Sequence, residues 1–338
     1  EGLRDIRALE ALALMARELR KPVIVLKVGR SERSRAAALS HTASLSGSDD
    51  AANAVFERLG MARVGHLPAF LETLKLCHVL GALPGNAICS MSCSGGEAAL
   101  VADAAINHDV DLKPLPEPRK AVVRQALSPQ AAADNPLDYD TFDWADRDRL
   151  RTIFSAMMGS GFDLSLLVLD YPRADRCDPA DWRISEQALC DAVSQTGQRA
   201  ALVATLPENL PEAIAGDLCA AGIAPLIGVD DALTAIAASA RIGGAWSKAP
   251  PSPMLSASAF DPTDAGRIVD EHAAKALIGA FGVAVPAGRA AADIEDAVAA
   301  ASEIGYPVAL KALGVAHKSE AGAVAIGLDT EADLSLIH

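Results

Sequence analysis

Short apolar runs alternate along this sequence with segments whose apolar residues recur at helical spacing. The five clearest runs, rich mainly in Val, Ile, Leu and Ala, are residues 22–26, 86–91, 164–169, 200–204 and 224–227. Segments with helical spacing include residues 147–158, 183–195, 211–221 and 230–241. A strand that is apolar on both faces is typical of a parallel sheet covered by helices on both sides. The alternation predicts an α/β protein built from flavodoxin-like, doubly wound parallel sheets.

Clusters of Gly and Pro divide this pattern into parts. The first part is predicted to contain helices over 5–20, from Ser48 or Asp49 onward, and over 68–80, with strands over 22–26 and 61–64. The last part is predicted to contain helices over 264–280 and 293–303 and strands over 306–311 and 323–328. Gly and Pro interrupt helices and interior strands. The predicted domains are therefore residues 1–80, 86–247 and 262–338, with a Pro-rich linker over 248–261.

The amino-acid composition indicates how the cores are filled and which classes of partner are excluded. Hydrophobic residues make up 51% of the chain but aromatic residues only 4%, so the cores must be filled mainly by Ala, Val, Leu and Ile. The formal net charge of -14 argues against a nucleic-acid partner, because phosphate neutralisation needs a basic surface. No apolar run reaches the length of a membrane span, and the start has no signal-peptide layout, so we expect a cytoplasmic protein without a membrane partner. Six cysteines without a CxxC pair predict neither disulfides nor a metal site.

One histidine stands in an unusual setting. His41 lies in a loop of small and hydroxyl residues, directly before the helix predicted to begin near Ser48. A neutral imidazole can attack phosphorus, and a helix N-terminus offers N–H groups and a positive dipole end to the phosphoryl group. The loop therefore predicts a phosphohistidine site. Four other histidines lack such a setting and are expected to be structural or exposed: His66, His78, His108 and His272.

A second helix start has the same potential. Ser94, Gly95 and Gly96 lie between a predicted strand and a predicted helix, where backbone N–H groups are free and glycine allows close approach of a phosphate. A tight strand-to-helix turn would use the same residues without any ligand. Both readings stay open from sequence alone.

Residues 21–31 and 40–49 together closely resemble the succinyl-CoA ligase-like domain of NDP-forming (ADP-forming) acyl-CoA synthetases. The second segment reads Ser40-His41-Thr42-Ala43-Ser44-Leu45-Ser46-Gly47-Ser48-Asp49, with Ala43 and Ser44 where the family usually has Gly and Ala. The resemblance implies that His41 is transiently phosphorylated and that Glu1 hydrogen-bonds its imidazole. It also implies phosphate contacts from Gly47, Ser48 and Asp49, and from a second helix end at Ser94, Gly95 and Gly96.

The last 77 residues resemble the start of an ATP-grasp domain, as fused or paired with the ligase domains in this family. The matching segments are residues 271–275, 281–286, 304–311 and 317–322. The resemblance implies nucleotide contacts from Lys311 at the end of a strand and from His317, Lys318 and Gly322 in the following loop. No metal ligand is assigned, because the family's metal-binding carboxylates are expected beyond this segment.

The implied activity is ligation of a carboxylic acid to CoA with ATP, releasing ADP and phosphate, with Mg²⁺ aiding the nucleotide step. Expected partners are the acid, CoA and the nucleotide, in a homo-oligomer or in fused or paired α and β parts. The sequence has no initiating Met and stops within a helix-like run, so we expect an internal fragment, inactive alone, with its ATP/ADP, CoA and Mg²⁺ sites largely outside it. Two alternatives stay open: a ligand-sensing module of a GNAT-type protein lysine acetyltransferase, and a purely structural subunit.

Overall fold

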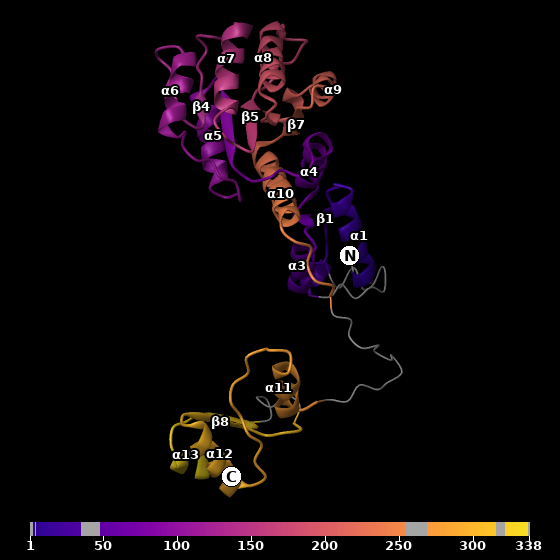
Figure 1. Cartoon of the computed structure of the whole chain (residues 1–338), viewed down its shortest axis with the longest axis vertical. Coiled ribbons are helices and arrows are strands. Elements are labelled where there is room, and N and C mark those ends of the chain that lie inside the picture. The colour runs from indigo at the N-terminus through magenta and orange to yellow at the C-terminus, as the bar shows by residue number, and fades with distance from the viewer. Residues whose placement is uncertain (1–2, 4, 35–47, 255–268, 316–321, 337–338) are drawn as a thin grey trace. The chain divides into compact units, whose positions relative to one another are not determined.

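The chain folds into two compact units in the computed structural model, residues 1–255 and residues 256–338 (Figure 1). The structure describes residues 3, 5–34, 48–254, 269–315 and 322–336.

The first unit begins with a small two-stranded sheet. Its parallel strands are β1 (Ile24–Leu26) and β2 (Ala62–Val64), and Val25 pairs with Arg63. The helices of this part are α1 (Ile6–Glu18), α3 (Asp49–Arg58) and α4 (Leu67–Leu80). A buried apolar core joins α1, α3 and the residues that precede β2: Ala13, Ala52, Phe56, Leu59 and Met61. The helix predicted to start near Ser48 is confirmed.

A five-stranded parallel sheet forms the larger part of this unit. Its strands are β3 (Ile88–Ser92), β4 (Leu137–Asp138), β5 (Leu164–Val168), β6 (Ala200–Ala204) and β7 (Ala224–Ile227). Their order is β4-β3-β5-β6-β7, and every pair is parallel. The chain places β4 on one side of β3 and continues on the other side with β5. This is the flavodoxin-like order, and the predicted fold class is confirmed.

Helices cover both faces of the larger sheet (Figure 1). They are α5 (Gly95–Ala105), α6 (Glu117–Ala126), α7 (Arg147–Met158), α8 (Ala180–Thr196), α9 (Glu212–Ala220) and α10 (Val229–Ser247), with a short 3-10 turn at Pro207–Asn209. Neighbouring strand residues enter opposite cores. Leu166 packs with the α5 and α10 side, whereas Leu167 packs with the α6 to α9 side. Burial on both faces explains why these strands read as continuous apolar runs.

Helix α10 also contacts the small sheet. Its residues Ala238 and Ile242 belong to the same buried cluster as Ala62 and Val64. One helix thus packs against both sheets of the first unit. The predicted division into residues 1–80 and 86–247 stays a prediction.

The second unit contains α11 (Glu271–Gly279), α12 (Ile294–Ile304), β8 (Val308–Lys311), β9 (Val324–Leu328) and α13 (Glu331–Ser335). Strands β8 and β9 are antiparallel and Lys311 pairs with Val324. Four buried residues form the centre of its small core: Ala297, Ala301, Leu328 and Leu334. Within the described residues, no helix of either unit is long and apolar enough to cross a membrane.

Candidate functional site

Several predicted site residues lie outside the described part of the chain. They are Glu1, His41, Gly47, His317 and Lys318. The structure does describe the start of the helix that follows the histidine loop, the second helix start, and two of the four predicted nucleotide residues.

The N-terminus of α3 is built as the sequence predicts. Ser48 is the N-cap, and its hydroxyl accepts a hydrogen bond from the N–H of Ala51 at 3.4 Å. The remaining first-turn amides of a helix have no intrahelical acceptor. An anion placed next to Ser48 would therefore meet free donors and the positive end of the helix dipole.

Asp49 is already engaged by cations at this helix start. Arg63 of β2 holds both of its carboxylate oxygens, at 2.9 and 3.0 Å. Lys27 and Arg30 lie 3.7 and 3.8 Å from the same carboxylate. The hydrogen bonds from Arg63 lower the pKa of Asp49, helped by the nearby charges. The Asp49 side chain therefore ties α3 to the end of the small sheet. An anion at this helix start would be bound by the backbone N–H of Asp49, not by its carboxylate.

No role for Arg63 was predicted from the sequence. Its guanidinium also donates to the side chain of Asn53 at 2.5 Å and to the backbone carbonyl of Lys27 at 3.2 Å. One arginine therefore holds β1, β2 and α3 together. An arginine inside the apolar run from Met61 to Val64 was the signal that could have identified it.

The second predicted helix start lies at the point where the larger sheet reverses its strand order. Ser94 is the N-cap of α5, two residues after the end of β3, and its side chain makes no capping hydrogen bond. The chain passes from β3 to β4 on one side of β3, and then from β4 to β5 on the other side of β3. Ligands of open α/β sheets usually bind in the crevice at such a switch point. A Cβ on Gly95 would lie 3.1 Å from a carboxylate oxygen of Asp138, so the glycine allows a close approach of that side chain.

Carboxylates surround this helix start. Glu97 lies in the first turn of α5, and one of its oxygens is buried without a hydrogen-bond partner. Burial, followed by the charges of Asp170 and Asp138, raises the pKa of Glu97 to about 7. Asp170 is held by the N–H and hydroxyl of Thr205 at 2.7 and 2.5 Å. A phosphate at Ser94 would therefore be opposed by an ionised Glu97, but not by a protonated one.

We predict that Glu97 makes stability depend on pH. Because its pKa in the folded chain is above the ordinary value of 4.5, the protonated form favours folding. This contribution is complete below pH 4.5 and is lost as the pH rises through about 7. Glu97→Gln, which stays neutral, should melt at a higher temperature than the parent at pH 8 and at nearly the same temperature at pH 4.5. Equal melting temperatures at pH 8 would contradict the assignment. Besides Asp138 and Asp170, the titratable groups near Glu97 are Cys93 and Tyr139.

Asn135, which lies just before β4, has a structural role. Its amide oxygen accepts from the N–H of Ser90 at 3.0 Å, and its nitrogen donates to the carbonyls of Ile88 and Lys113 at 2.9 and 2.8 Å. The side chain is buried and all of these partners are backbone groups. Asn135 therefore joins β3 to the segment that precedes α6.

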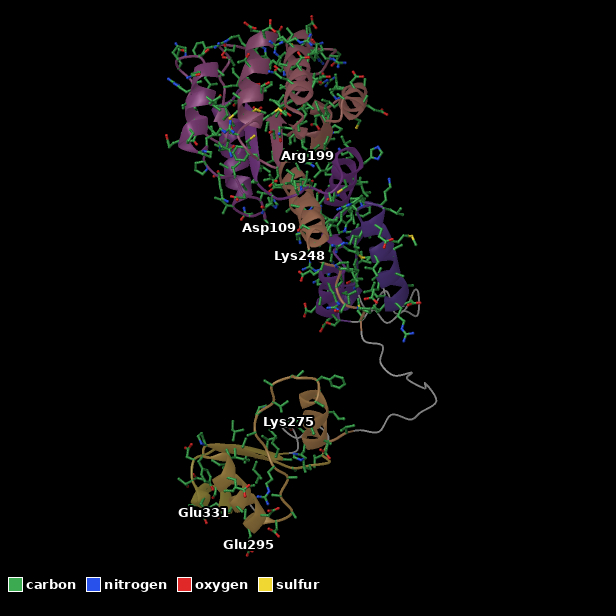
Figure 2. The ribbon with its side chains drawn as sticks, in the orientation of Figure 1. Asp109, Arg199, Lys248, Lys275, Glu295 and Glu331 are labelled. Carbon is green, nitrogen blue, oxygen red and sulfur yellow. The ribbon has the colours of Figure 1, made fainter. Side chains whose placement is uncertain are left out.

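The second unit brings Lys311 and Gly322 to one pocket of about 1130 Å³. Lys311 donates to Glu271 of α11 at 2.7 Å, and Lys275 lies 2.9 Å from the same oxygen. Figure 2 shows Lys275 on α11. Two ammonium groups that share one carboxylate leave positive charge for a nucleotide phosphate. No group of three or more His, Cys, Asp or Glu suited to a metal occurs among the residues that the structure describes.

Two family models match the chain. Residues 1–77 match the family described as succinyl-CoA ligase like flavodoxin domain, and residues 263–336 match the ATP-grasp domain. The resemblance to the ADP-forming acyl-CoA synthetase family is confirmed. The two matches stand at opposite ends of the chain, in the order that the sequence resemblance predicts.

Relatives of this family align with nearly the whole chain. The ADP-forming 4-hydroxybutyrate–CoA ligase of Nitrosopumilus maritimus is 25% identical over 342 residues, which cover 95% of this chain and 46% of that ligase. A trans-feruloyl-CoA synthase from an unknown prokaryotic organism is 26% identical over 345 residues, 98% of this chain and 47% of that synthase. The chain thus spans about half the length of the curated relatives it matches.

A solved structure has the same fold. It is the dinucleotide forming acetyl-coenzyme A synthetase 1 of Candidatus Korarchaeum cryptofilum, in complex with phosphate and ADP. The TM-score is 0.60 at 21% identity, and the match covers 73% of this chain and 52% of that one. At this identity, the likeness concerns the fold.

Proposed function

We propose that this chain is part of an ADP-forming acid–thiol ligase that makes acyl-CoA from a carboxylic acid, CoA and ATP through a phosphohistidine. The observation that carries the proposal is the order of the two family matches, with the histidine loop inside the first and the predicted nucleotide residues inside the second. The names of the relatives that align with almost the whole chain support the same activity.

In this proposal His41 carries the phosphoryl group. A ring nitrogen of neutral His41 attacks the γ-phosphorus of ATP, the bond to the bridging oxygen breaks, and ADP leaves. The carboxylate of the acid then takes the phosphoryl group from His41 and becomes an acyl phosphate. Attack of the CoA thiolate on the acyl carbon expels phosphate and gives acyl-CoA. Glu1 would accept a hydrogen bond from the other ring nitrogen and stabilise the positive charge formed on attack.

Two helix ends would receive the phosphoryl group. Gly47, Ser48 and Asp49 would contribute backbone donors at α3, and Ser94 to Gly96 would contribute them at α5. The capped start of α3 and the uncapped Ser94 side chain support these roles. Protonated Glu97 would keep the second helix end free of an opposing charge.

On the nucleotide side, Lys311, His317, Lys318 and Gly322 would bind the phosphates of ATP or ADP. The cationic pocket around Lys311 and Lys275 supports this assignment. Mg²⁺, when bound with the nucleotide, would neutralise charge on its phosphates. We assign no Mg²⁺ ligand to this chain.

We assign the complete reaction to a longer protein, because the chain spans about half of its relatives. That protein is expected to be a cytoplasmic homo-oligomer or an assembly of fused or paired α and β parts. Residues 1–338 alone are expected to be inactive.

The decisive experiment follows nucleotide products of the full-length protein. Acetate, a larger aliphatic acid, an aryl acid and a hydroxycinnamic acid are each supplied with ATP, Mg²⁺ and CoA. At least one acid should cause release of ADP that requires CoA, with matching formation of acyl-CoA. Release of AMP would contradict the proposal. So would acetyl transfer to protein lysines without ADP release, which would instead favour the acetyltransferase module.

A further inference from the structure

Two lysines of the second unit converge on one carboxylate oxygen. Lys311, at the end of β8, donates to an oxygen of Glu271 at 2.7 Å, and Lys275 lies 2.9 Å from the same oxygen. Glu271 and Lys275 are one turn apart on α11, so a helix and a strand meet at this point. All three side chains line the pocket of about 1130 Å³.

The two ammonium groups are held close together. Because both nitrogens contact the same oxygen, their separation cannot exceed the sum of the two contact distances. Like charges at such a separation repel each other unless an anion lies between them. A hydrogen bond from an ammonium to an anionic oxygen is about 2.7–2.9 Å long, for a phosphate as for a carboxylate. A phosphate oxygen can therefore bridge the two nitrogens as the oxygen of Glu271 does.

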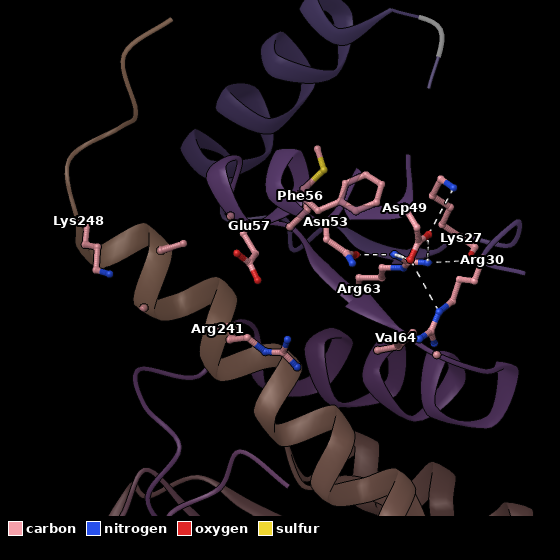
Figure 3. A pocket seen from close by; sticks show the side chains of 15 residues that line it. Lys27, Arg30, Asp49, Asn53, Phe56, Glu57, Arg63, Val64, Arg241 and Lys248 are labelled. Carbon is pink, nitrogen blue, oxygen red and sulfur yellow. Dashed lines mark hydrogen bonds and ion pairs between the residues drawn. The ribbon is translucent and has the colours of Figure 1, made fainter. Parts of the chain in front are cut away.

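Both lysines are also open to a ligand, unlike the cations around Asp49 in the first unit. There Arg63 donates to both carboxylate oxygens and the Lys27 side chain is only 3% exposed (Figure 3). The side chains of Lys275 and Lys311 are 33% and 40% exposed. An ammonium has three donors, and the contact with the carboxylate uses one of them. Each lysine can therefore accept a second anionic partner from the pocket.

The other strongly charged side chains of the described pocket lining are engaged elsewhere. Arg289 holds Asp296 and Glu303 at 2.8 and 3.0 Å. Asp293 also lines the pocket, but its carboxylate accepts the N–H of Asp296 as the cap of α12. Of the Lys and Arg side chains in this lining, the two lysines are the ones that a phosphate can share.

We propose that Lys275 binds the same nucleotide phosphate as Lys311, and that Glu271 holds the two ammonium groups together in the absence of nucleotide. This inference rests on the proposed function, which places Lys311 on the phosphates of ATP or ADP. It adds a phosphate ligand on α11 and a role for Glu271, neither of which the sequence resemblance implies.

Glu271 has two opposite effects on phosphate binding. Its ion pairs with the lysines bring the donors together, but partly exposed ion pairs contribute little free energy. Its negative charge repels a phosphate that binds the same two nitrogens. The repulsion acts over a few ångströms and is the larger effect, so removing the charge of Glu271 should strengthen phosphate binding.

The first test compares ADP with adenosine in isothermal titration calorimetry of the full-length protein. The two ligands share base and ribose, and ADP alone has phosphates. Lys275→Met should weaken ADP binding about tenfold or more and leave adenosine binding unchanged, because a charged donor is lost. Methionine has nearly the helix propensity of lysine, so α11 should form normally. Parental affinity for ADP would overturn the role of Lys275, and so would an equal loss of affinity for both ligands.

A double-mutant cycle tests whether the two lysines share one phosphate. When either lysine is removed, the charge of the other is neutralised by Glu271 and helps the phosphate less. Lys275→Met with Lys311→Met should therefore weaken ADP binding by less than the product of the two single effects. Single effects that multiply would place the lysines on different phosphates and would overturn the proposal.

Two further variants test the role of charge. Glu271→Gln should bind ADP several-fold more tightly than the parent and adenosine equally well. Weaker binding of ADP would overturn the role given to Glu271. The matched control is Arg289→Gln, which removes a cation of the same pocket that two carboxylates already hold. It should keep the parental ratio of ADP to adenosine affinity. A loss as large as that of Lys275→Met would reduce the effect to general attraction and overturn the proposal.

These results are distinguishable from a failure of the proposed function. A full-length protein that releases no ADP from ATP with any acid and CoA, and binds no ADP, would overturn the ligase and this inference with it. A protein that releases ADP, but whose Lys275→Met variant binds ADP as the parent does, would overturn the inference alone.

Discussion

His41→Ala is expected to abolish phosphorylation of the full-length protein by γ-labelled ATP. Removing the nucleophile leaves no group on which the phosphoenzyme can form, so the label should be absent and ligase turnover should fall by about 10³-fold or more. The parent should give a label that survives alkali and is lost in acid, as a phosphorus–nitrogen bond on imidazole requires. Gel autoradiography after each treatment measures both properties.

The matched control for this experiment is another histidine. The ring of His108 lies 3.0 Å from Asp230, far along the sequence from the histidine loop. His108→Ala should therefore keep the full label. Label that survives in His41→Ala, or that resists acid in the parent, would eliminate His41 as the phosphorylated residue.

Gly243→Ala is expected to destabilise the first unit by about 3 kcal/mol or more. An added Cβ would lie 1.8 Å from the backbone oxygen of Leu83 and 2.8 Å from its carbonyl carbon. Two hydrogen bonds of Ser239 hold α10 close to this segment, one from the N–H of Leu83 at 3.0 Å and one to the carbonyl of Gly81 at 3.2 Å. Because the clash is with backbone, no side chain can turn away to relieve it. Urea unfolding followed by circular dichroism would measure the loss.

The neighbouring glycine provides the control. Gly244 is in the same helix, but a Cβ there would meet nothing within 4 Å. Gly244→Ala should therefore raise the free energy of unfolding by about 0.5–1 kcal/mol, through the higher helix propensity of alanine. If the two alanine variants had the same stability, the close approach of α10 to Leu83 would be refuted.

Elements with strong periodicity were predictable from the sequence. Strands β6 and β7 and helix α7 have the predicted bounds. Their continuous apolar runs and clear helical spacing each fit one type of secondary structure. Among the α-helices and strands of the described residues, α6 and β4 were not predicted. Helix α6 has only Val123 and Ala126 buried, and β4 has two residues, so neither presents a recognisable period.

The site was less predictable than the fold. The cap at Ser48 follows from local sequence, whereas the ion pair of Asp49 with Arg63 depends on how α3 crosses the pair β1–β2. Glycines before a helix left a phosphate site and a plain turn equally open at Ser94, and only the strand order brings Asp138 and Asp170 near Glu97. Asp138 and Asp170 follow different strands, so no local sequence pattern predicts that they lie near Glu97.

Helix α10 has a consequence for anyone who divides the first unit for expression. A protein beginning at residue 86 would keep α10 but lose the partners of Ala238 and Ile242, which are Ala62, Val64 and Ala69. A protein ending at residue 80 would lose α10 and leave the same small sheet uncovered. Each half would expose an apolar strip that the other half normally hides, and would tend to aggregate. The gap between α4 and β3 is a break in the sequence of elements, but it is a poor place to cut the gene.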